Sequence, residues 1–326
     1  MEIKAGLSFR LLQLLILFIL AFWALSGCSS THEFTFYFTS SRGENGYPDI
    51  YQVTYDGKDQ TFQRVTNTQE IEQSPIVSND GEMILYKVGG LRLENSLNLL
   101  ILDSMSTSEV ARGDFFSPGE WSPDDKKVAY LSDWQSGSYQ LFLLDIETMN
   151  HEVVPISLED YEVVDVTWSP NGSTVAIATL PNRYSTNSGR SQIWLFQFDN
   201  QTLTPLTSVR DGDCQWPAWA PKDEWIAVVC RREDDHGQLY LFSTDGEEKI
   251  QITENPDTIS SDLKLLHNPV TWVRTPHWLP NSENILYVAA PQLDGDWILY
   301  MTNISGDFHE PILHDPGLWG DISVQK

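Results

Sequence analysis

Short apolar segments recur along the chain, and a polar turn precedes each of them. Five of these segments contain almost only aliphatic, aromatic and alanine residues: 83–86, 128–131, 175–178, 225–229 and 285–288. Apolar runs of this length, bounded by turn residues, are typical of buried β-strands. No stretch after residue 28 has the length and period that would predict a long helix.

The turns before these strands share one motif. Proline at the second turn position fixes φ, and Asp, Asn or Gly beside it tolerates the bend, so each copy predicts a tight hairpin turn. The first copy is a decayed form that lacks both the tryptophan and the proline. The five copies are Val77-Ser78-Asn79-Asp80-Gly81, Trp121-Ser122-Pro123-Asp124-Asp125, Trp168-Ser169-Pro170-Asn171-Gly172, Trp219-Ala220-Pro221-Lys222-Asp223 and Trp278-Leu279-Pro280-Asn281-Ser282. Their first residues are 44, 47, 51 and 59 residues apart, close to the length of one four-stranded propeller blade.

Each repeat has a second half. Another apolar strand follows at 141–144, 193–196, 239–242 and 299–301. We expect a fourth strand to end in Val65-Thr66, Leu206-Thr207 and Ile252-Thr253. The whole pattern, a Trp-Ser-Pro-Asp-Gly turn followed by these strands, resembles the WD40-like (PD40) repeat of the TolB-type β-propellers over nearly all residues after 33. The resemblance implies an all-β propeller and a binding role in the cell envelope.

The two ends of the propeller region are incomplete in complementary ways. Residues 34–40 align with the second strand of a blade, whereas residues 317–324 form one strand left over after the last repeat. Pairing these two segments in one shared blade would close the ring without a long free edge. We therefore predict a six-bladed β-propeller of four-stranded antiparallel blades over residues 34–326.

The N-terminus has the features of a bacterial lipoprotein signal peptide. Lys4 and Arg10 precede an apolar run over 11–25, and small residues lead to Cys28. We expect cleavage after residue 27, lipidation of Cys28 and a short tether over 28–33; an uncleaved transmembrane anchor is the alternative. Because Ser29 follows the cysteine, a diderm source would place the protein on the periplasmic side of the outer membrane. Otherwise it would lie on the outer face of the cytoplasmic membrane.

The chain is strongly acidic, with 46 Asp and Glu against 20 Lys and Arg and a formal charge of -26. Such a body repels nucleic acid and anionic lipid, so no nucleic-acid partner is expected. The charge is explained either by solubility or by a cationic partner.

One face of the propeller carries the candidate binding residues. The connections that enter the innermost strands gather around the mouth of the central channel, and the longest, 254–275, includes a predicted helical turn. The candidate binding face consists of Phe115, Phe116, Asp160, Tyr161, Asp211, Asp213 and His267, with Glu70, Glu72, Asp114 and Glu162 beside them. The alternative is that these are ordinary solvated loop residues.

Cys214 and Cys230 lie on either side of the turn at Lys222. An antiparallel hairpin would bring them nearly opposite each other, and an oxidising compartment would allow a disulfide. A register shift of one residue would leave two buried thiols instead.

Signals for catalysis are weak. The sequence has no G-x-S-x-G, H-E-x-x-H, C-x-x-C or phosphate-binding glycine loop, so we predict no catalytic residue, metal or cofactor. His277 could face the channel, where similar lyases hold a metal, or could be structural. Residues 233–236 and 294–296 could hold Ca²⁺ or form plain turns. The repeated tryptophans favour packing between blades over sugar binding.

These observations predict a non-catalytic, lipid-anchored envelope protein that presents its loop face to a protein or peptide. Two alternatives stay open: a lyase-like enzyme that uses a metal in the channel, and a sensor of small ligands or glycans at the channel mouth.

Overall fold

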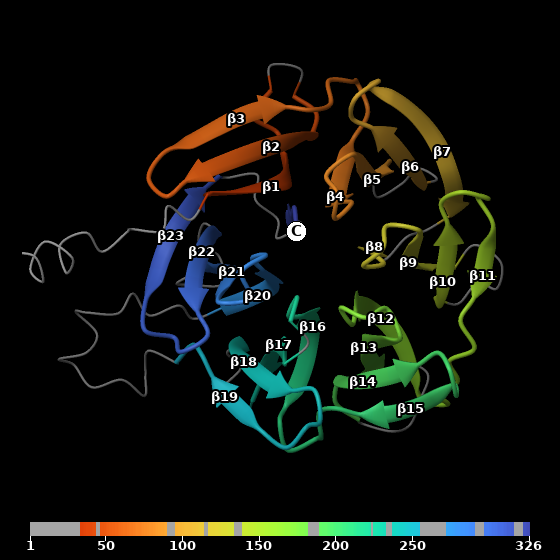
Figure 1. The fold of residues 1–326 in the computed structure, drawn as a ribbon, viewed down its shortest axis with the longest axis vertical. Coiled ribbons are helices and arrows are strands. Elements are labelled where there is room, and N and C mark those ends of the chain that lie inside the picture. The colour runs from red at the N-terminus through yellow and green to blue at the C-terminus, as the bar shows by residue number, and fades with distance from the viewer. Residues whose placement is uncertain are drawn as a thin grey trace, which may run out of the picture.

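The chain folds as a six-bladed β-propeller (Figure 1). The computed structural model describes residues 33–43, 46–89, 95–113, 117–133, 139–181, 189–222, 224–232, 237–254, 272–290, 297–315 and 322–326. Within these ranges, β-strands form six four-stranded antiparallel sheets, which confirms the predicted fold. No helix in these ranges is long and apolar enough to cross a membrane. The signal segment, Cys28 and the expected helical turn in 254–275 lie outside the described residues.

The strands are assigned to blades from the innermost strand outward. Blade 1 contains β24 (Ile322–Val324), β1 (Glu33–Ser40), β2 (Asp49–Asp56) and β3 (Gln60–Arg64). Blade 2 contains β4 (Glu72–Val77), β5 (Met83–Val88), β6 (Asn95–Ile101) and β7 (Ser106–Gly113). Blade 3 contains β8 (Ser117–Trp121), β9 (Lys127–Ser132), β10 (Gln140–Asp145) and β11 (His151–Val153).

The other three blades repeat this order. Blade 4 contains β12 (Tyr161–Trp168), β13 (Thr174–Pro181), β14 (Gln192–Gln197) and β15 (Thr202–Pro205). Blade 5 contains β16 (Asp213–Trp219), β17 (Trp225–Arg231), β18 (Gly237–Ser243) and β19 (Lys249–Gln251). Blade 6 contains β20 (Trp272–Trp278), β21 (Asn284–Ala290), β22 (Ile298–Asn303) and β23 (His309–His314).

Burial within a blade depends on the position of the strand. The second strand is buried on both faces because neighbouring blades pack against it, and every residue of β21 is buried. The fourth strand forms the rim and is largely exposed, and it is short in β15 and β19. This gradient explains why the second strands appear in the sequence as continuous apolar runs, whereas the rim strands give a weak signal.

The expected ends of the fourth strands need a correction. Val65-Thr66, Leu206-Thr207 and Ile252-Thr253 follow β3, β15 and β19 and do not belong to them. Each threonine instead accepts a hydrogen bond from a backbone N–H of the third strand. Thr66 Oγ1 lies 2.9 Å from Ile50 N, Thr207 Oγ1 2.9 Å from Ile193 N, and Thr253 Oγ1 2.9 Å from Leu239 N. The threonines therefore satisfy backbone donors that the shorter rim strands leave unpaired.

The repeated tryptophans join neighbouring blades. The indole N–H of Trp121 donates to Ile76 O at 3.0 Å, and that of Trp168 donates to Glu120 O at 3.1 Å. Trp278 donates to Ala218 O at 2.9 Å. In each case the acceptor belongs to the innermost strand of the preceding blade. The tryptophans thus combine burial with a directed bond, which agrees with the expected packing role.

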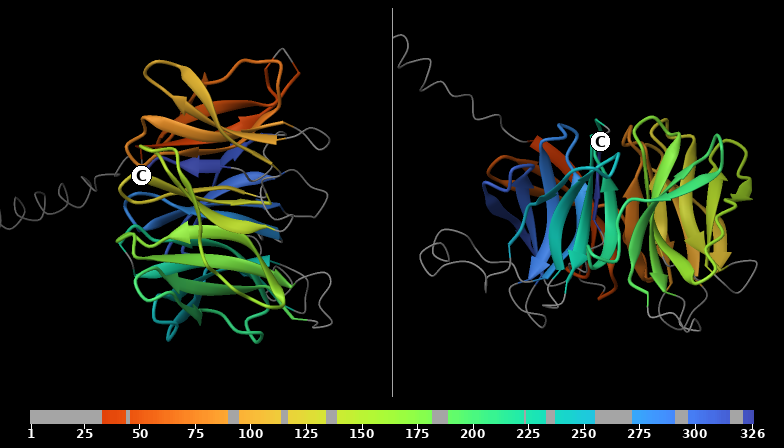
Figure 2. Two further views of the ribbon diagram at one scale, coloured as in Figure 1. Left: turned by 90° about the vertical axis from the view of Figure 1, so that its right-hand side faces the viewer. Right: turned by 90° about the horizontal axis from the view of Figure 1, so that it is seen from below.

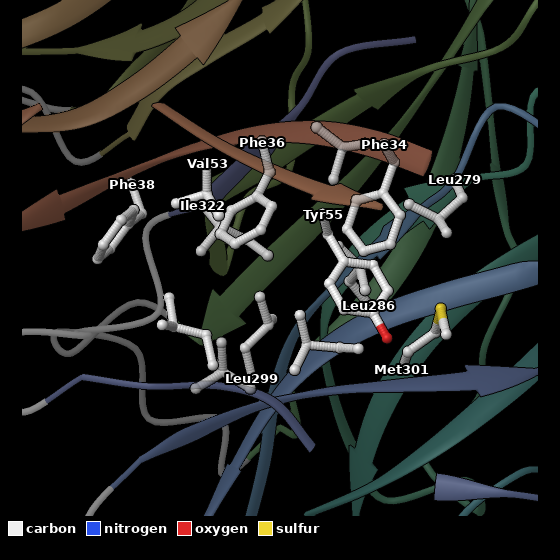
Figure 3. Close-up of a cluster of buried hydrophobic side chains, with 14 of the residues drawn as sticks. Phe34, Phe36, Phe38, Val53, Tyr55, Leu279, Leu286, Leu299, Met301 and Ile322 are labelled. Carbon is white, nitrogen blue, oxygen red and sulfur yellow. The ribbon is translucent and has the colours of Figure 1, made fainter. Parts of the chain in front are cut away.

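The ring closes through the shared blade 1. β24 pairs with β1, with Val324 opposite Phe36 and Ile322 opposite Phe38. A cluster of buried side chains from blades 1 and 6 fills the seam, including Phe34, Phe36 and Leu286 (Figure 3). The first and last parts of the propeller region are therefore held together by both a strand ladder and an apolar interface.

A buried carboxylate strengthens the same seam. Asp315 follows β23, and its side chain is only 4% exposed. Its Oδ1 atom accepts a hydrogen bond from Ser40 Oγ at 3.1 Å, and Arg42 forms an ion pair with its Oδ2 atom. Asp315 thus connects blade 6 to the end of β1 in blade 1.

The strand directions define two faces of the disc. The face with the Trp-Ser-Pro-Asp turns, called the turn face, also carries the start of β1 at Glu33 and the end of the chain at Lys326. The opposite face, called the loop face, carries the starts of the innermost strands, such as Tyr161 and Asp213. Figure 2 shows the disc from the side, with the C-terminus on one of its faces.

We predict that replacing Trp168 by Phe lowers the free energy of unfolding by roughly 1–3 kcal/mol, because the partly buried carbonyl oxygen of Glu120 loses its donor. Trp194 provides the matched control, since its indole N–H is buried without a hydrogen-bond partner in the described structure. Trp194→Phe should be neutral or stabilising. Urea unfolding of both variants measures the difference; equal losses of stability would contradict the role assigned to the Trp168 bond.

We also predict that Asp315→Ala lowers the free energy of unfolding by about 2 kcal/mol, because Ser40 and Arg42 lose a charged acceptor in a buried seam. The control is Glu109→Ala, which removes the exposed ion pair with Arg112. That change should cost less than about 1 kcal/mol. Chemical unfolding compares the two, and a control as destabilising as Asp315→Ala would show that the seam contact has no special weight.

Candidate functional site

The innermost strands enclose a cavity of about 240 Å³ in the central channel. Its wall includes Ser74, Asp165, Trp216, Thr275 and His277, which come from the innermost strands of blades 2, 4, 5 and 6. A cavity of this size holds several waters or a small organic group. The channel therefore offers space for a ligand at the centre of the ring, and a second, larger hollow of about 670 Å³ lies between blades 3 and 4.

One layer of the channel wall is formed by the residue directly before each tryptophan position. Three of these side chains accept a hydrogen bond from the backbone of the next blade. Glu120 Oε2 lies 2.8 Å from Trp168 N, Thr167 Oγ1 3.1 Å from Trp219 N, and Ser323 Oγ 2.9 Å from Val77 N. This layer thus joins blades and lines the channel at the same time.

Near the turn face, the channel contains an ion pair. Lys326 Nζ lies 2.8 Å from Glu120 Oε1, so the last residue of the chain reaches the centre of the ring (Figure 1). Both oxygens of Glu120 therefore have a partner, because Oε2 accepts the bond from Trp168. This carboxylate is occupied by contacts within the chain.

His277 belongs to the same layer. Its Nε2 atom is buried and has no hydrogen-bond partner in the described structure, while the residue as a whole is half-buried. Burial lowers the pKa of His277 to about 4, although the charge of Glu120 acts in the opposite direction. The imidazole is therefore neutral at pH 7 and offers one polar nitrogen to the channel.

The described residues do not supply a metal-binding set around His277. Nowhere in those ranges do three or more His, Cys, Asp or Glu side chains come close enough to hold a metal ion. The two possible calcium segments, 233–236 and 294–296, lie outside the described residues.

The candidate binding face is present in part within the described structure. Asp160 and Tyr161 lie at the start of β12, and Asp211 and Asp213 lie at the start of β16, all on the loop face. Asp160, Tyr161, Asp211 and Asp213 are half-buried. Phe115, Phe116 and His267 lie outside the described residues.

Two of these carboxylates already have partners. Lys249 Nζ lies 2.8 Å from Asp211 Oδ1, and Arg231 lies 3.7 Å from Asp213 Oδ2. Partial burial acts to raise the pKa of Asp211, but hydrogen bonds from Lys249 and Ser208 hold it below its usual value. Asp211 and Asp213 therefore help to order the loop before β16.

Glu72 differs from its expected place on a solvated rim. It is 2% exposed, and its Oε2 atom lacks a hydrogen-bond partner in the described structure. Burial raises the pKa of its carboxyl, against hydrogen bonds from Thr66 and Thr68. Glu70 is exposed and Glu162 half-buried, and neither side chain makes a hydrogen bond or ion pair within the described ranges.

Arg274, in β20, is a candidate site residue that the sequence pattern does not indicate. It lies in β20 near the loop face, with Trp216 and Trp297 beside its guanidinium. No repeat places an arginine at this position in other blades, so periodicity gave no signal. Trp216 and Trp297 are far apart in sequence, so they lie beside Arg274 only in the folded propeller.

Cys214 and Cys230 form a disulfide between β16 and β17. The two residues stand directly opposite each other in the ladder, with a Cα–Cα distance of 4.1 Å. Both are buried in the interface between blades 4 and 5. The covalent link fixes the hairpin that carries Asp213 and Trp216 toward the channel mouth.

The fold and its channel define a six-bladed β-propeller whose structural neighbours include TolB proteins. The solved structure of TolB from Acinetobacter baumannii gives a TM-score of 0.67 at 15% identity and covers 94% of this chain and 70% of that chain. A putative TolB from Agrobacterium tumefaciens gives 0.61 at 16% identity, covering 90% and 97%. An oligogalacturonate lyase from Vibrio parahaemolyticus gives 0.55 at 15% identity, covering 85% and 72%. At these identities the likeness establishes the fold.

Sequence comparison finds peptidases of which this chain matches a small part. The uncharacterized peptidase YuxL of Bacillus subtilis is 27% identical over 150 residues, which are 46% of this chain and 20% of YuxL. Dipeptidyl peptidase 4 of Arthroderma otae is 27% identical over 146 residues, or 43% and 17% of the two chains. The matched region thus spans a fifth or less of these relatives. No protein-family model matches the chain.

We predict that replacing both Cys214 and Cys230 by Ala lowers the free energy of unfolding by about 3 kcal/mol, because the unfolded chain loses a cross-link over 16 residues. Denaturant unfolding with and without a reducing agent measures the effect. Reduced native protein should resemble the double variant, whereas the variant itself should not respond to the reducing agent. Equal midpoints for oxidised and reduced native protein would contradict a stabilising disulfide.

Proposed function

We propose that this protein is a non-catalytic binding or scaffold protein of the bacterial cell envelope. In this proposal, lipid on Cys28 anchors it to a membrane, and the loop face binds a protein or peptide. In a diderm source, the protein lies on the periplasmic side of the outer membrane. In any other source, it lies on the outer face of the cytoplasmic membrane. The TolB likeness supports the propeller as the framework for such a surface.

The observation that carries the proposal is the position of the two faces. Glu33, the described residue nearest to Cys28 in sequence, begins β1 on the turn face. Tyr161 and Asp213 begin their strands on the loop face. An anchor that leaves from the turn face directs the loop face away from the bilayer, where a partner has access to it.

The charges of the loop face favour a partner with basic groups. The whole chain has a formal charge of -26, and the carboxylates of Glu70 and Glu162 are not neutralised by described neighbours. Complementary charge increases the association rate and selects against acidic competitors. A protein or peptide with exposed Lys or Arg therefore fits this surface best.

The lyase-like alternative has less support. His277 faces the channel, as that alternative expects, but the described residues do not surround it with further metal ligands. A neutral imidazole next to the Glu120–Lys326 ion pair is equally consistent with a structural layer that joins blades.

We predict that a partner recovered from native membranes with the mature protein is lost when Asp160 and Tyr161 are both replaced by Ala. The matched control carries Met105→Ala and Glu283→Ala, one large apolar and one acidic residue exposed on the turn face. Affinity capture followed by mass spectrometry of the bound proteins measures both. The control should retain the partner; its loss from both variants, or from neither, would contradict a specific role of the loop face.

Fractionation of the same cells tests the anchor within this experiment. The native protein should be found in the membrane fraction, and Cys28→Ala should be released from it or retain its signal peptide. Mass spectrometry of the native N-terminus should identify a diacylglyceryl group. An unmodified Cys28 in a membrane-bound protein would favour the transmembrane alternative.

A further inference from the structure

Arg274 lies close to two tryptophans, one of which, Trp216, lines the channel cavity. Its guanidinium carbon is 4.3 Å from the ring centroid of Trp297 and 5.9 Å from that of Trp216. Contacts of this kind attract a cation to the face of an aromatic ring. A guanidinium in such a contact still has five N–H donors with which it can bind a ligand.

Those donors have no acceptor within the described part of the chain. Arg42 contacts Asp315, Arg64 contacts Asp49 and Arg231 contacts Asp213, whereas Arg274 makes no hydrogen bond or ion pair there. The side chain is half-buried, and burial lowers the pKa of its guanidinium. Its desolvation is therefore not offset by a carboxylate in these ranges.

The neighbouring residue provides a second, independent observation. Thr275 lines the channel cavity together with Trp216, and its Oγ1 atom is buried without a hydrogen-bond partner in the described structure. Thr275 and Trp216 have positive φ values of 40° and 52° at equivalent bulges of β20 and β16. Ser74 in β4 has the same type of conformation, so the bulge belongs to the repeat, while the unsatisfied hydroxyl and the arginine are particular to blade 6.

We propose that Arg274, framed by Trp216 and Trp297, is a binding site for a carboxylate of a ligand from outside the chain. A carboxylate matches the planar guanidinium because two parallel N–H···O bonds can form. The indole rings exclude water from one side and so strengthen the pairing. The site does not depend on the lipid anchor or on the loop-face partner, and its ligand is either a small organic acid or an acidic group of a peptide.

Arginine modification tests the site directly. The purified propeller is treated with phenylglyoxal, and adducts at individual arginines are measured by mass spectrometry with and without roughly 10 mM succinate, which suffices for a ligand of millimolar affinity. We expect succinate to reduce the adduct at Arg274 at least fivefold and leave the exposed Arg210 unchanged. Succinamide, which lacks the charges, should not protect. Equal protection of Arg210, or protection by succinamide, would overturn the proposal.

A second pair of compounds distinguishes the two sources of the carboxylate. Acetyl-triglycine with a free C-terminal acid is compared with its C-terminal amide. Protection by the free acid at least as strong as that by succinate indicates a peptide carboxylate, whereas protection by succinate alone indicates a small organic acid. Failure of both acids to protect Arg274 would overturn the site.

Variants separate binding from folding. Saturation-transfer NMR should detect succinate bound to the native protein and to the control Arg210→Gln, and should lose the signal with Arg274→Gln. Arg274→Lys keeps the charge but loses the planar pair of donors, so its affinity should fall at least tenfold. Circular dichroism establishes that each variant is folded; if Arg274→Gln does not fold, Arg274→Lys and the protection experiment decide. Undiminished binding by a folded Arg274→Lys or Arg274→Gln variant would contradict the proposal.

Discussion

The packing of each blade against the next is the constraint on which the rest of the structure depends. A blade is a small twisted sheet whose second strand is apolar on both faces, so it is stable only between two neighbours. The indole of Trp168 connects such neighbours by donating to Glu120 O, a carbonyl that lines the channel. Burial supplies most of the stability of the interface, and the directed bond fixes how far one blade can slide against another.

The same dependence makes ring closure decisive. In an open row of blades, the first and last would each expose a full apolar face. Here β24 supplies the innermost strand that blade 1 lacks, and Phe36 and Phe38 lie against it in the ladder. Asp315 adds a buried polar contact from blade 6 to Ser40. Closure therefore places the end of the chain at the channel, where Lys326 meets Glu120.

Much of this architecture was predictable because it is encoded locally and repeated. The Trp-Ser-Pro-Asp turns specified the hairpins, and the incomplete segments at both ends specified the shared blade. The ends of the rim strands were predicted less accurately. Thr66 was expected to end a strand, but it follows β3 and accepts a hydrogen bond from Ile50 N. An exposed edge strand has no apolar pattern that would define its end. Glu72 was expected in solvent, yet it is buried, since sequence alone does not reveal which loop residues a neighbouring blade covers.

The site was harder to predict for a related reason. Arg274, Trp216 and Trp297 come from three separate segments, and none belongs to the repeated motif. In a repeat protein, the positions that agree between blades hold the ring together, so residues that differ from blade to blade are the ones free to acquire a ligand. The layer before each tryptophan shows both kinds of residue. Thr167 accepts a hydrogen bond from the next blade, whereas the Nε2 atom of His277 has no hydrogen-bond partner among the described residues. The proposed binding chemistry of Arg274 is thus a departure from the repeat, on a frame that the repeated contacts hold together.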